Sequence, residues 1–131
     1  MISNGKHIRE GFNTVTPYLI VEGAVQLIDF MVRVFGAEEI RRDLHPNGTI
    51  MNAEIRIGDS VVELAEAGDA WSPMPGALHV YVQDTDDVYH RALQAGAISL
   101  YPPADMDYGE RSAGVKDPVG NHWYLATYQP N

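Results

Sequence analysis

The same order of apolar and polar positions occurs twice along the chain. An apolar run over residues 16–20 precedes a helical stripe of apolar residues that ends at Gly36. A second apolar run over residues 79–82 precedes another helical stripe, which ends at Gly96. Glycine after a helical stripe supplies the left-handed position at which many helices stop, and these two glycines lie 60 positions apart. The pattern therefore predicts a strand followed by a helix in each half of the chain.

Three strand-like runs follow each predicted helix. Alternation is clearest where Ala53 and Ile55 are interleaved with Glu54 and Arg56. The six runs cover approximately residues 38–45, 49–57, 60–65, 97–102, 109–116 and 121–128. The sequence thus predicts a βαβββ unit that occurs twice. A ferredoxin-like α+β sandwich is the alternative, but that fold would place only two strands after each helix.

The repeat divides the chain into two modules. The first module covers residues 13–66 and the second covers residues 77–128. The linker between them, residues 67–76, is dense in Pro and Gly, which favour turns. A chain of 131 residues can bury a hydrophobic core without a disulfide or a metal ion to hold it together. We therefore expect residues 1–131 to form a single domain.

Composition and charge exclude several classes of function. The chain has 9 Lys and Arg against 18 Asp and Glu, a formal net charge of -9, which disfavours nucleic acid and anionic membrane surfaces as partners. It has no cysteine, which excludes disulfides, iron–sulfur clusters and thiol nucleophiles. Neither a signal-peptide pattern nor an apolar stretch of membrane-spanning length is present. We expect a cytoplasmic protein that binds neither nucleic acid nor membranes.

Three stretches of the sequence resemble those of a known family. They are the apolar run 16–20 with its helix, the run 78–82 with its helix, and residues 116–123, in which the turn Asp117-Pro118-Val119-Gly120-Asn121 precedes the last strand. From about Thr14 to Tyr128 the chain resembles the vicinal oxygen chelate superfamily of glyoxalase I, bleomycin-resistance proteins and extradiol dioxygenases. This resemblance implies a glyoxalase-like α+β fold, in which two βαβββ modules form open, curved mixed sheets around a cavity. It also implies a homodimer whose cavities are shared between the two chains.

The resemblance also suggests where a divalent metal ion would bind. Metal-dependent members hold the ion with residues of the first and last strands of each module, and these positions fall on Thr16, Glu63, His79 and Tyr124. Glu63 and His79 are good metal ligands, whereas Thr16 and a protonated Tyr124 are poor ones. His122 shares a strand face with Tyr124 and could complete a trio with Glu63 and His79, the composition of the non-haem iron triad. Without a metal, a Glu63–His79 hydrogen bond would satisfy both side chains.

Three functions remain open on this evidence. The first is a metal-dependent lyase, isomerase or dioxygenase-like enzyme, with Glu63 as the base and His79 and Tyr124 as further catalytic residues. The second is a non-catalytic binder of the bleomycin-resistance type, which sequesters a cationic drug in an acidic, aromatic cavity. The third is an enzyme that uses Glu63, His79 and the tyrosines without a metal. All three require a cavity that binds a small molecule.

Strand alternation supplies further candidate ligand-binding residues. If Glu63 and His79 point into the cavity, then Tyr18, Tyr81 and His122 lie on the same faces of their strands and point inward as well. Tyrosine and histidine rings in a cavity would suit an aromatic or cationic ligand.

Two further candidates, Arg111 and Tyr108, lie elsewhere in the second module. Arg111 could bind a carboxylate or phosphonate through two hydrogen bonds, or could be a charge that protects an edge strand. Tyr108 lies in a predicted loop over residues 101–109, which is either a lid over the cavity or an ordinary loop. Glu54 and Arg56 are expected to face solvent, because the other face of their strand is the apolar one.

Overall fold

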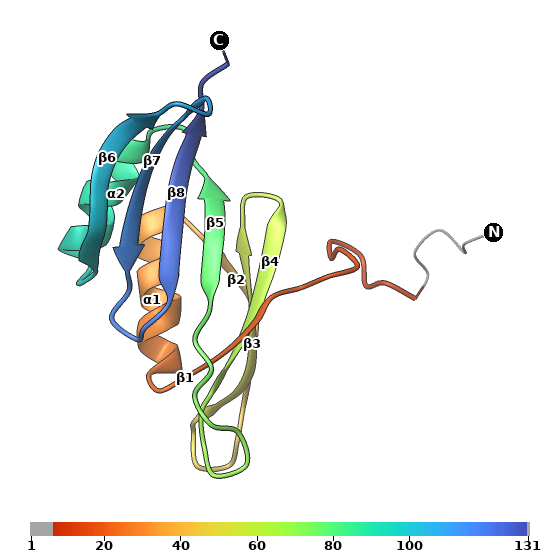
Figure 1. The fold of residues 1–131 in the computed structure, drawn as a ribbon. Coiled ribbons are helices and arrows are strands. Elements are labelled where there is room, and N and C mark those ends of the chain that lie inside the picture. Colours follow the sequence, from red (N-terminus) through yellow and green to blue (C-terminus); the bar gives the residue numbers. More distant parts are fainter. Residues whose placement is uncertain (1–6, 131) are drawn as a thin grey trace.

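The computed structural model describes residues 7–130, which contain two helices and two four-stranded sheets (Figure 1). The elements of the first module are β1 (Tyr18–Val21), α1 (Ala24–Phe35), β2 (Glu38–Leu44), β3 (Ile50–Ile57) and β4 (Ser60–Glu66). Those of the second module are β5 (Ala77–Tyr81), α2 (Thr85–Gln94), β6 (Ile98–Met106), β7 (Glu110–Lys116) and β8 (His122–Tyr128). The predicted βαβββ order therefore occurs twice. Neither helix of the described residues is long and apolar enough to cross a membrane.

The two sheets have the same topology. The strand order is β1-β4-β3-β2 in the first sheet and β5-β8-β7-β6 in the second. In each sheet the first strand of the module runs parallel to the last, and the remaining neighbours are antiparallel. In the view of Figure 1 the sheets stand side by side and the helices lie behind the second sheet. The prediction of a glyoxalase-like α+β fold with two open mixed sheets is confirmed.

The ends of the helices are held in different ways. At the start of α2 the carboxylate of Asp84 accepts a hydrogen bond of 3.1 Å from the backbone N–H of Asp87. No side chain of its own first turn caps α1. Instead, Glu66 at the end of β4 accepts a hydrogen bond of 2.9 Å from the N–H of Ala24. Helix α1 ends at Gly36, whose φ of 66° lies in the left-handed region.

One hydrophobic core joins the two modules. The fully buried Trp123 of β8 packs against two rings of α1, with centroid distances of 6.3 Å to Phe30 and 5.0 Å to Phe35. Its indole N–H donates a hydrogen bond of 2.7 Å to the buried carboxylate of Asp117. The same carboxylate accepts from the N–H of Val119 at 2.9 Å, so the turn before β8 both ends β7 and positions the tryptophan.

The predicted loop over residues 101–109 is wrong in its first part, because β6 continues through it. Pairing with β7 shifts register between Tyr101 and Ala104, so that Pro102 and Pro103 fall within an irregularity of the ladder. Proline has no N–H to donate, but β6 lies at the edge of its sheet, where proline is tolerated. Tyr101 is therefore fixed in a strand, which is incompatible with a mobile lid at this position.

Candidate functional site

Each sheet has one face packed against the core and one open face. In β8, Trp123 and Leu125 are fully buried, so the alternate residues lie on the open face. Strand pairing aligns Tyr124 of β8 with His79 of β5 on one side and with Gly114 of β7 on the other. We call this open face of the second sheet the aromatic face, after the rings that share it: His79, Tyr81, Tyr101, His122 and Tyr124.

A glycine makes room for the outermost ring of the aromatic face. Tyr101 of β6 pairs with Gly114, and a Cβ atom at Gly114 would lie only 2.6 Å from the Tyr101 ring. The ring therefore lies flat over the backbone of β7. It stacks on Tyr124 with a centroid distance of 6.4 Å and an interplanar angle of 21°. Its hydroxyl is 2.8 Å from the Oγ of Ser112, within hydrogen-bonding distance, which holds the stacked pair in place.

A carboxylate lies at the edge of the aromatic face. The ring of His79 contacts that of Tyr81 edge-on, with 4.9 Å between centroids, and its Nε2 is 3.6 Å from Oε2 of Glu110. The Nδ1 of His122 is 3.2 Å from the Tyr124 hydroxyl. Aromatic ring faces attract cations, and a neighbouring carboxylate adds to this attraction. The arrangement is therefore suited to hold a positively charged group.

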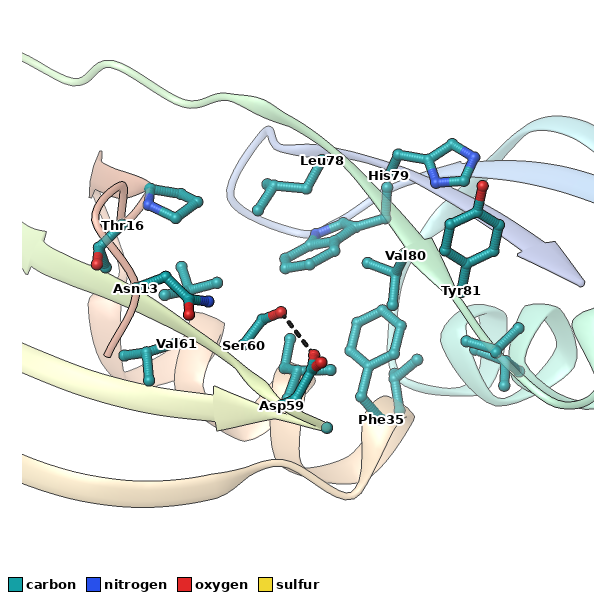
Figure 2. A pocket seen from close by; sticks show the side chains of 18 of the residues that line it. Asn13, Thr16, Phe35, Asp59, Ser60, Val61, Leu78, His79, Val80 and Tyr81 are labelled. Carbon is teal, nitrogen blue, oxygen red and sulfur yellow. Dashed lines mark hydrogen bonds between the residues drawn. The ribbon is translucent and has the colours of Figure 1, made fainter. Parts of the chain in front are cut away.

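A crevice between the modules adjoins the aromatic face. Its volume is about 700 Å³, and it runs beside β5 between α1 and the β3–β4 turn. Figure 2 shows Phe35 and Val80 within the crevice, whereas the rings of His79 and Tyr81 lie together on the other side of β5. A hydrogen bond of 3.0 Å between Ser60 and Asp59 lies at its polar rim. The crevice is therefore an apolar space next to the aromatic face, which suits a positively charged group.

The open face of the first sheet has different chemistry. Tyr18, Glu63 and Glu54 lie opposite one another on β1, β4 and β3, and we call these three residues the acidic row. Burial and the charge of Glu63 raise the pKa of Tyr18. Glu54 is only 5% exposed because the preceding segment, residues 7–16, covers it and places the guanidinium of Arg9 on its carboxylate. The expectation that Glu54 faces solvent is therefore wrong.

The two metal-ligand candidates lie on different sheets. Glu63 is on β4 of the first sheet and His79 is on β5 of the second. The predicted Glu63–His79 hydrogen bond is replaced by the contact between His79 and Glu110. Within residues 7–130, no three His, Asp or Glu side chains gather closely enough to hold a metal ion. The trio of Glu63, His79 and His122 is thus not assembled within one chain, where these donors do not form a metal site.

Arg111 lies away from the aromatic face, whereas Tyr108 lies in the turn next to Glu110 at its edge. Arg111 is on the helix-facing side of β7, in alternation with Ser112 and Gly114. It donates to Asp86 of α2 through Nε at 2.6 Å and Nη2 at 3.0 Å. This hydrogen-bonded ion pair lowers the pKa of Asp86 and ties the helix to the sheet. Tyr108 is 67% exposed in the turn between β6 and β7.

Two residues of these faces carry no distinct signal in the sequence. Glu110 begins a strand, and only the fold brings it to His79. Arg9 precedes the first predicted strand, 45 positions from its partner Glu54. The small residue Gly114 opposite an aromatic residue is the one local feature that could have placed Tyr101 on the sheet.

Known proteins resemble this chain along most of its length. Residues 11–125 match the Glyoxalase/Bleomycin resistance protein/Dioxygenase superfamily. An uncharacterized protein of Mycobacterium bovis, Mb0911c, is 34% identical over 122 residues, which cover 85% of this chain and 80% of that protein. The uncharacterized protein Rv0887c of Mycobacterium tuberculosis has the same identity over the same length, with 72% of its own chain covered.

Solved structures share the fold. TioX from Micromonospora sp. ML1 superposes with a TM-score of 0.75 at 26% identity, covering 88% of this chain and 98% of TioX. The fosfomycin resistance protein FosX from Mesorhizobium loti gives a TM-score of 0.65 at 18% identity, covering 88% of this chain and 91% of FosX. At that identity the likeness to FosX concerns the fold alone.

Proposed function

The chain belongs to the Glyoxalase/Bleomycin resistance protein/Dioxygenase superfamily, and on this premise we propose that it binds a small organic cation on the aromatic face. The observation that carries the proposal is the stacked pair of Tyr101 and Tyr124 next to His79 and Tyr81, with Glu110 at the edge. A cation over such rings gains about 0.5–1 kcal/mol per ring at exposed sites and more when water is excluded. The net charge of -9 also raises the local concentration of cations.

The crevice supports a ligand with an apolar part. Its volume of about 700 Å³ is within the range of about 300–1,000 Å³ that is typical of small-molecule sites. Phe35, Leu78 and Val80 line it, while His79 and Tyr81 lie on the other side of the same strand. A molecule with a cationic head on the aromatic face could therefore place a hydrophobic body along β5.

A second chain would complete the site. The aromatic face is open in one chain, so a ligand there would be covered on one side only. We propose a homodimer in which a second copy covers this face and the two chains share each cavity, as the superfamily resemblance implies. Light scattering during size-exclusion chromatography tests this directly, and a monomer at micromolar concentration would contradict it.

A metal-dependent lyase, isomerase or dioxygenase is the second candidate. It is favoured only by the presence of Glu63 and His79 at positions that the superfamily uses for metal ligands. The donors do not converge within one chain, and two ligands alone would hold a divalent ion weakly. An equimolar divalent ion in protein purified without chelators would favour this candidate over simple binding.

A pair of matched ligands tests cation binding on the aromatic face. Choline and 3,3-dimethyl-1-butanol have the same shape, but only choline is charged. We expect choline to shift the NMR signals of His79 and Tyr124 and the neutral alcohol to leave them nearly unchanged. Tyr124→Leu should weaken choline binding about fivefold, which corresponds to the loss of about 1 kcal/mol of cation–π attraction.

Trp71→Leu is the matched control, because Trp71 is an aromatic residue that is exposed in the linker and lies outside the aromatic face. This substitution should leave choline affinity unchanged. Equal binding of the two ligands, or equal affinity of choline for the wild type and Tyr124→Leu, would contradict the proposal.

A further inference from the structure

The segment before β1 lies against the open face of the first sheet. We call residues 7–16 the N-terminal strap. Arg9 of the strap donates to Glu54 through both Nη atoms, with Nη1 2.8 Å from Oε2. A cavity of about 340 Å³ is lined jointly by strap residues and by Glu54 and Glu63. In Figure 1 the strap runs out from the start of β1, away from both helices.

The carboxylate beneath the strap needs a positive partner. Glu54 is nearly buried, and it lies directly opposite Glu63 in the β3–β4 ladder. Like charges at directly opposite strand positions repel, and a buried carboxylate without a partner is costly. Arg9 meets both requirements with a two-point hydrogen-bonded ion pair, the geometry in which a guanidinium binds a carboxylate most strongly.

The strap itself is held by few contacts. The guanidinium of Arg9 packs over the ring of Phe12 at 4.3 Å, and the N–H of Phe12 donates to the carbonyl of Arg9 at 3.0 Å. The Arg9 side chain remains 51% exposed, and the strap residues from Asn13 to Val15 are exposed as well. A segment with little buried surface opens at low cost in free energy. The strap can therefore leave the sheet while the core stays folded.

We infer that the N-terminal strap is an internal competitor: Arg9 occupies the position on Glu54, next to Glu63, that a ligand's guanidinium or amidinium group would take, and release of the strap opens it. This inference rests on the proposed function, in that the ligand is a cation. It adds that the first sheet selects a cation with N–H donors, whereas the aromatic face also accepts a quaternary ammonium, which has none. Binding at the acidic row is thus limited by the fraction of molecules in which the strap is released.

Benzamidine, which is protonated at neutral pH, is the probe for this position, and benzamide is its neutral counterpart. The readout is the NMR shift of the backbone amides of Ala53 and Leu64, which flank the acidic row in the same ladder. If the strap is closed in about nine molecules of ten, Arg9→Gln should bind benzamidine about tenfold more tightly than the wild type. Benzamide should not bind to either protein.

Two further variants complete this test. Arg33→Gln is the matched control, because Arg33 is an exposed arginine on α1 that pairs with Asp29, and it should behave as the wild type. Adding Glu54→Gln to Arg9→Gln should abolish the gain in affinity. Equal affinity of Arg9→Gln and the wild type, or a gain that survives Glu54→Gln, would overturn the inference.

Glu54→Gln alone covers the case in which Arg9→Gln does not fold. The amide side chain keeps the size of glutamate but loses the charge that holds Arg9, so the strap should detach and trypsin should cleave after Arg9 faster than in the wild type. Cleavage no faster than in the wild type would overturn the inference. Choline shifts at Tyr124 report separately on the proposed function. A missing choline response would contradict the proposed function, whereas a missing effect of Arg9→Gln would contradict the role of the strap.

Discussion

The open faces of the two sheets occupy equivalent places in the repeat and carry opposite chemistry. The row across the first sheet contains Tyr18, Glu63, Glu54 and Arg41, and the equivalent row across the second contains His79, Tyr124, Gly114 and Tyr101. The first row contains two carboxylates, and the strap covers Glu54. The second is aromatic and open. One backbone arrangement thus supports two surfaces that suit different cations, and the side chains alone distinguish them.

The difference is sharpest at the third position of each row. Glu54 fills this position in the first sheet and requires Arg9 to neutralise it. Gly114 leaves it empty in the second sheet, which allows Tyr101 to lie against the backbone and stack on Tyr124. At this position a charged residue thus accompanies a covered ion pair in one sheet, and glycine accompanies a stacked aromatic pair in the other.

The largest expected effect concerns the joint between the two modules. Trp123→Ala should lower the free energy of unfolding by about 3–5 kcal/mol, because it removes a fully buried ring that packs on Phe30 and Phe35. Urea unfolding followed by circular dichroism measures this loss. The wild type should unfold in one transition, since the modules share a core. Two separate transitions would show that the modules are independent units.

The next largest effect is expected at Gly114, the residue without a side chain in the row across the second sheet. Gly114→Ala should destabilise the protein by about 1–3 kcal/mol, because the new methyl group would lie 2.6 Å from the ring of Tyr101. The control is Gly68→Ala, where an added Cβ atom meets nothing within 4 Å. Adding Tyr101→Ala to Gly114→Ala should remove the clash. If Gly114→Ala unfolds at the same urea concentration as Gly68→Ala, the flat placement of Tyr101 is wrong.

A smaller expected effect concerns the N-terminal cap of α2. Asp84→Ala should cost about 1 kcal/mol of stability in chemical denaturation, because it removes the acceptor for the N–H of Asp87 at the start of α2. Asp84→Asn should cost less, since asparagine is also a good N-cap residue. Equal losses for the two variants would mean that the carboxylate acts through its charge and not through this hydrogen bond.

The smallest expected effect is a change in the pKa of Tyr18 on the first sheet. Burial, and after it the charge of Glu63, raise the pKa of Tyr18 above its ordinary value of 10.0. A raised pKa in the folded state means that the neutral phenol contributes stability below about pH 10, and that this contribution is lost as the pH rises through the folded pKa. Glu63→Gln should therefore lower the pKa of Tyr18 part of the way toward its ordinary value and reduce the alkaline loss of stability.

Ultraviolet titration of tyrosinate absorbance measures this change, with Tyr18→Phe identifying the contribution of Tyr18. An unchanged titration in Glu63→Gln would show that Glu63 does not face Tyr18.

The sequence predicts the frame of the fold well and its long-range pairings poorly. Gly36, Gly96 and Asp84 mark helix ends through local backbone requirements, so the βαβββ order can be predicted from them. Strand alternation likewise places His122 and Tyr124 on one face and Trp123 on the other. These features depend on residues close together in the chain.

The partners of charged side chains could not be predicted in this way. Arg9 and Glu54 are 45 positions apart, and Arg111 and Asp86 are 25 positions apart on different elements. Whether Glu63 meets His79 depends on how one sheet sits against the other, which no local pattern encodes. The edge position of β6, which accommodates Pro102 and Pro103, is also a property of the whole sheet.

The distant cap of α1 has a consequence for how the chain is made. The carboxylate of Glu66 and the N–H of Ala24 are separated by 42 positions, so this helix lacks its acceptor until the ribosome has synthesised the end of β4. Helix α2 carries its acceptor one residue before its own first turn. In the nascent chain, α1 can therefore be capped only after β4 has been synthesised. A truncation that stops short of Glu66 would leave α1 without this acceptor.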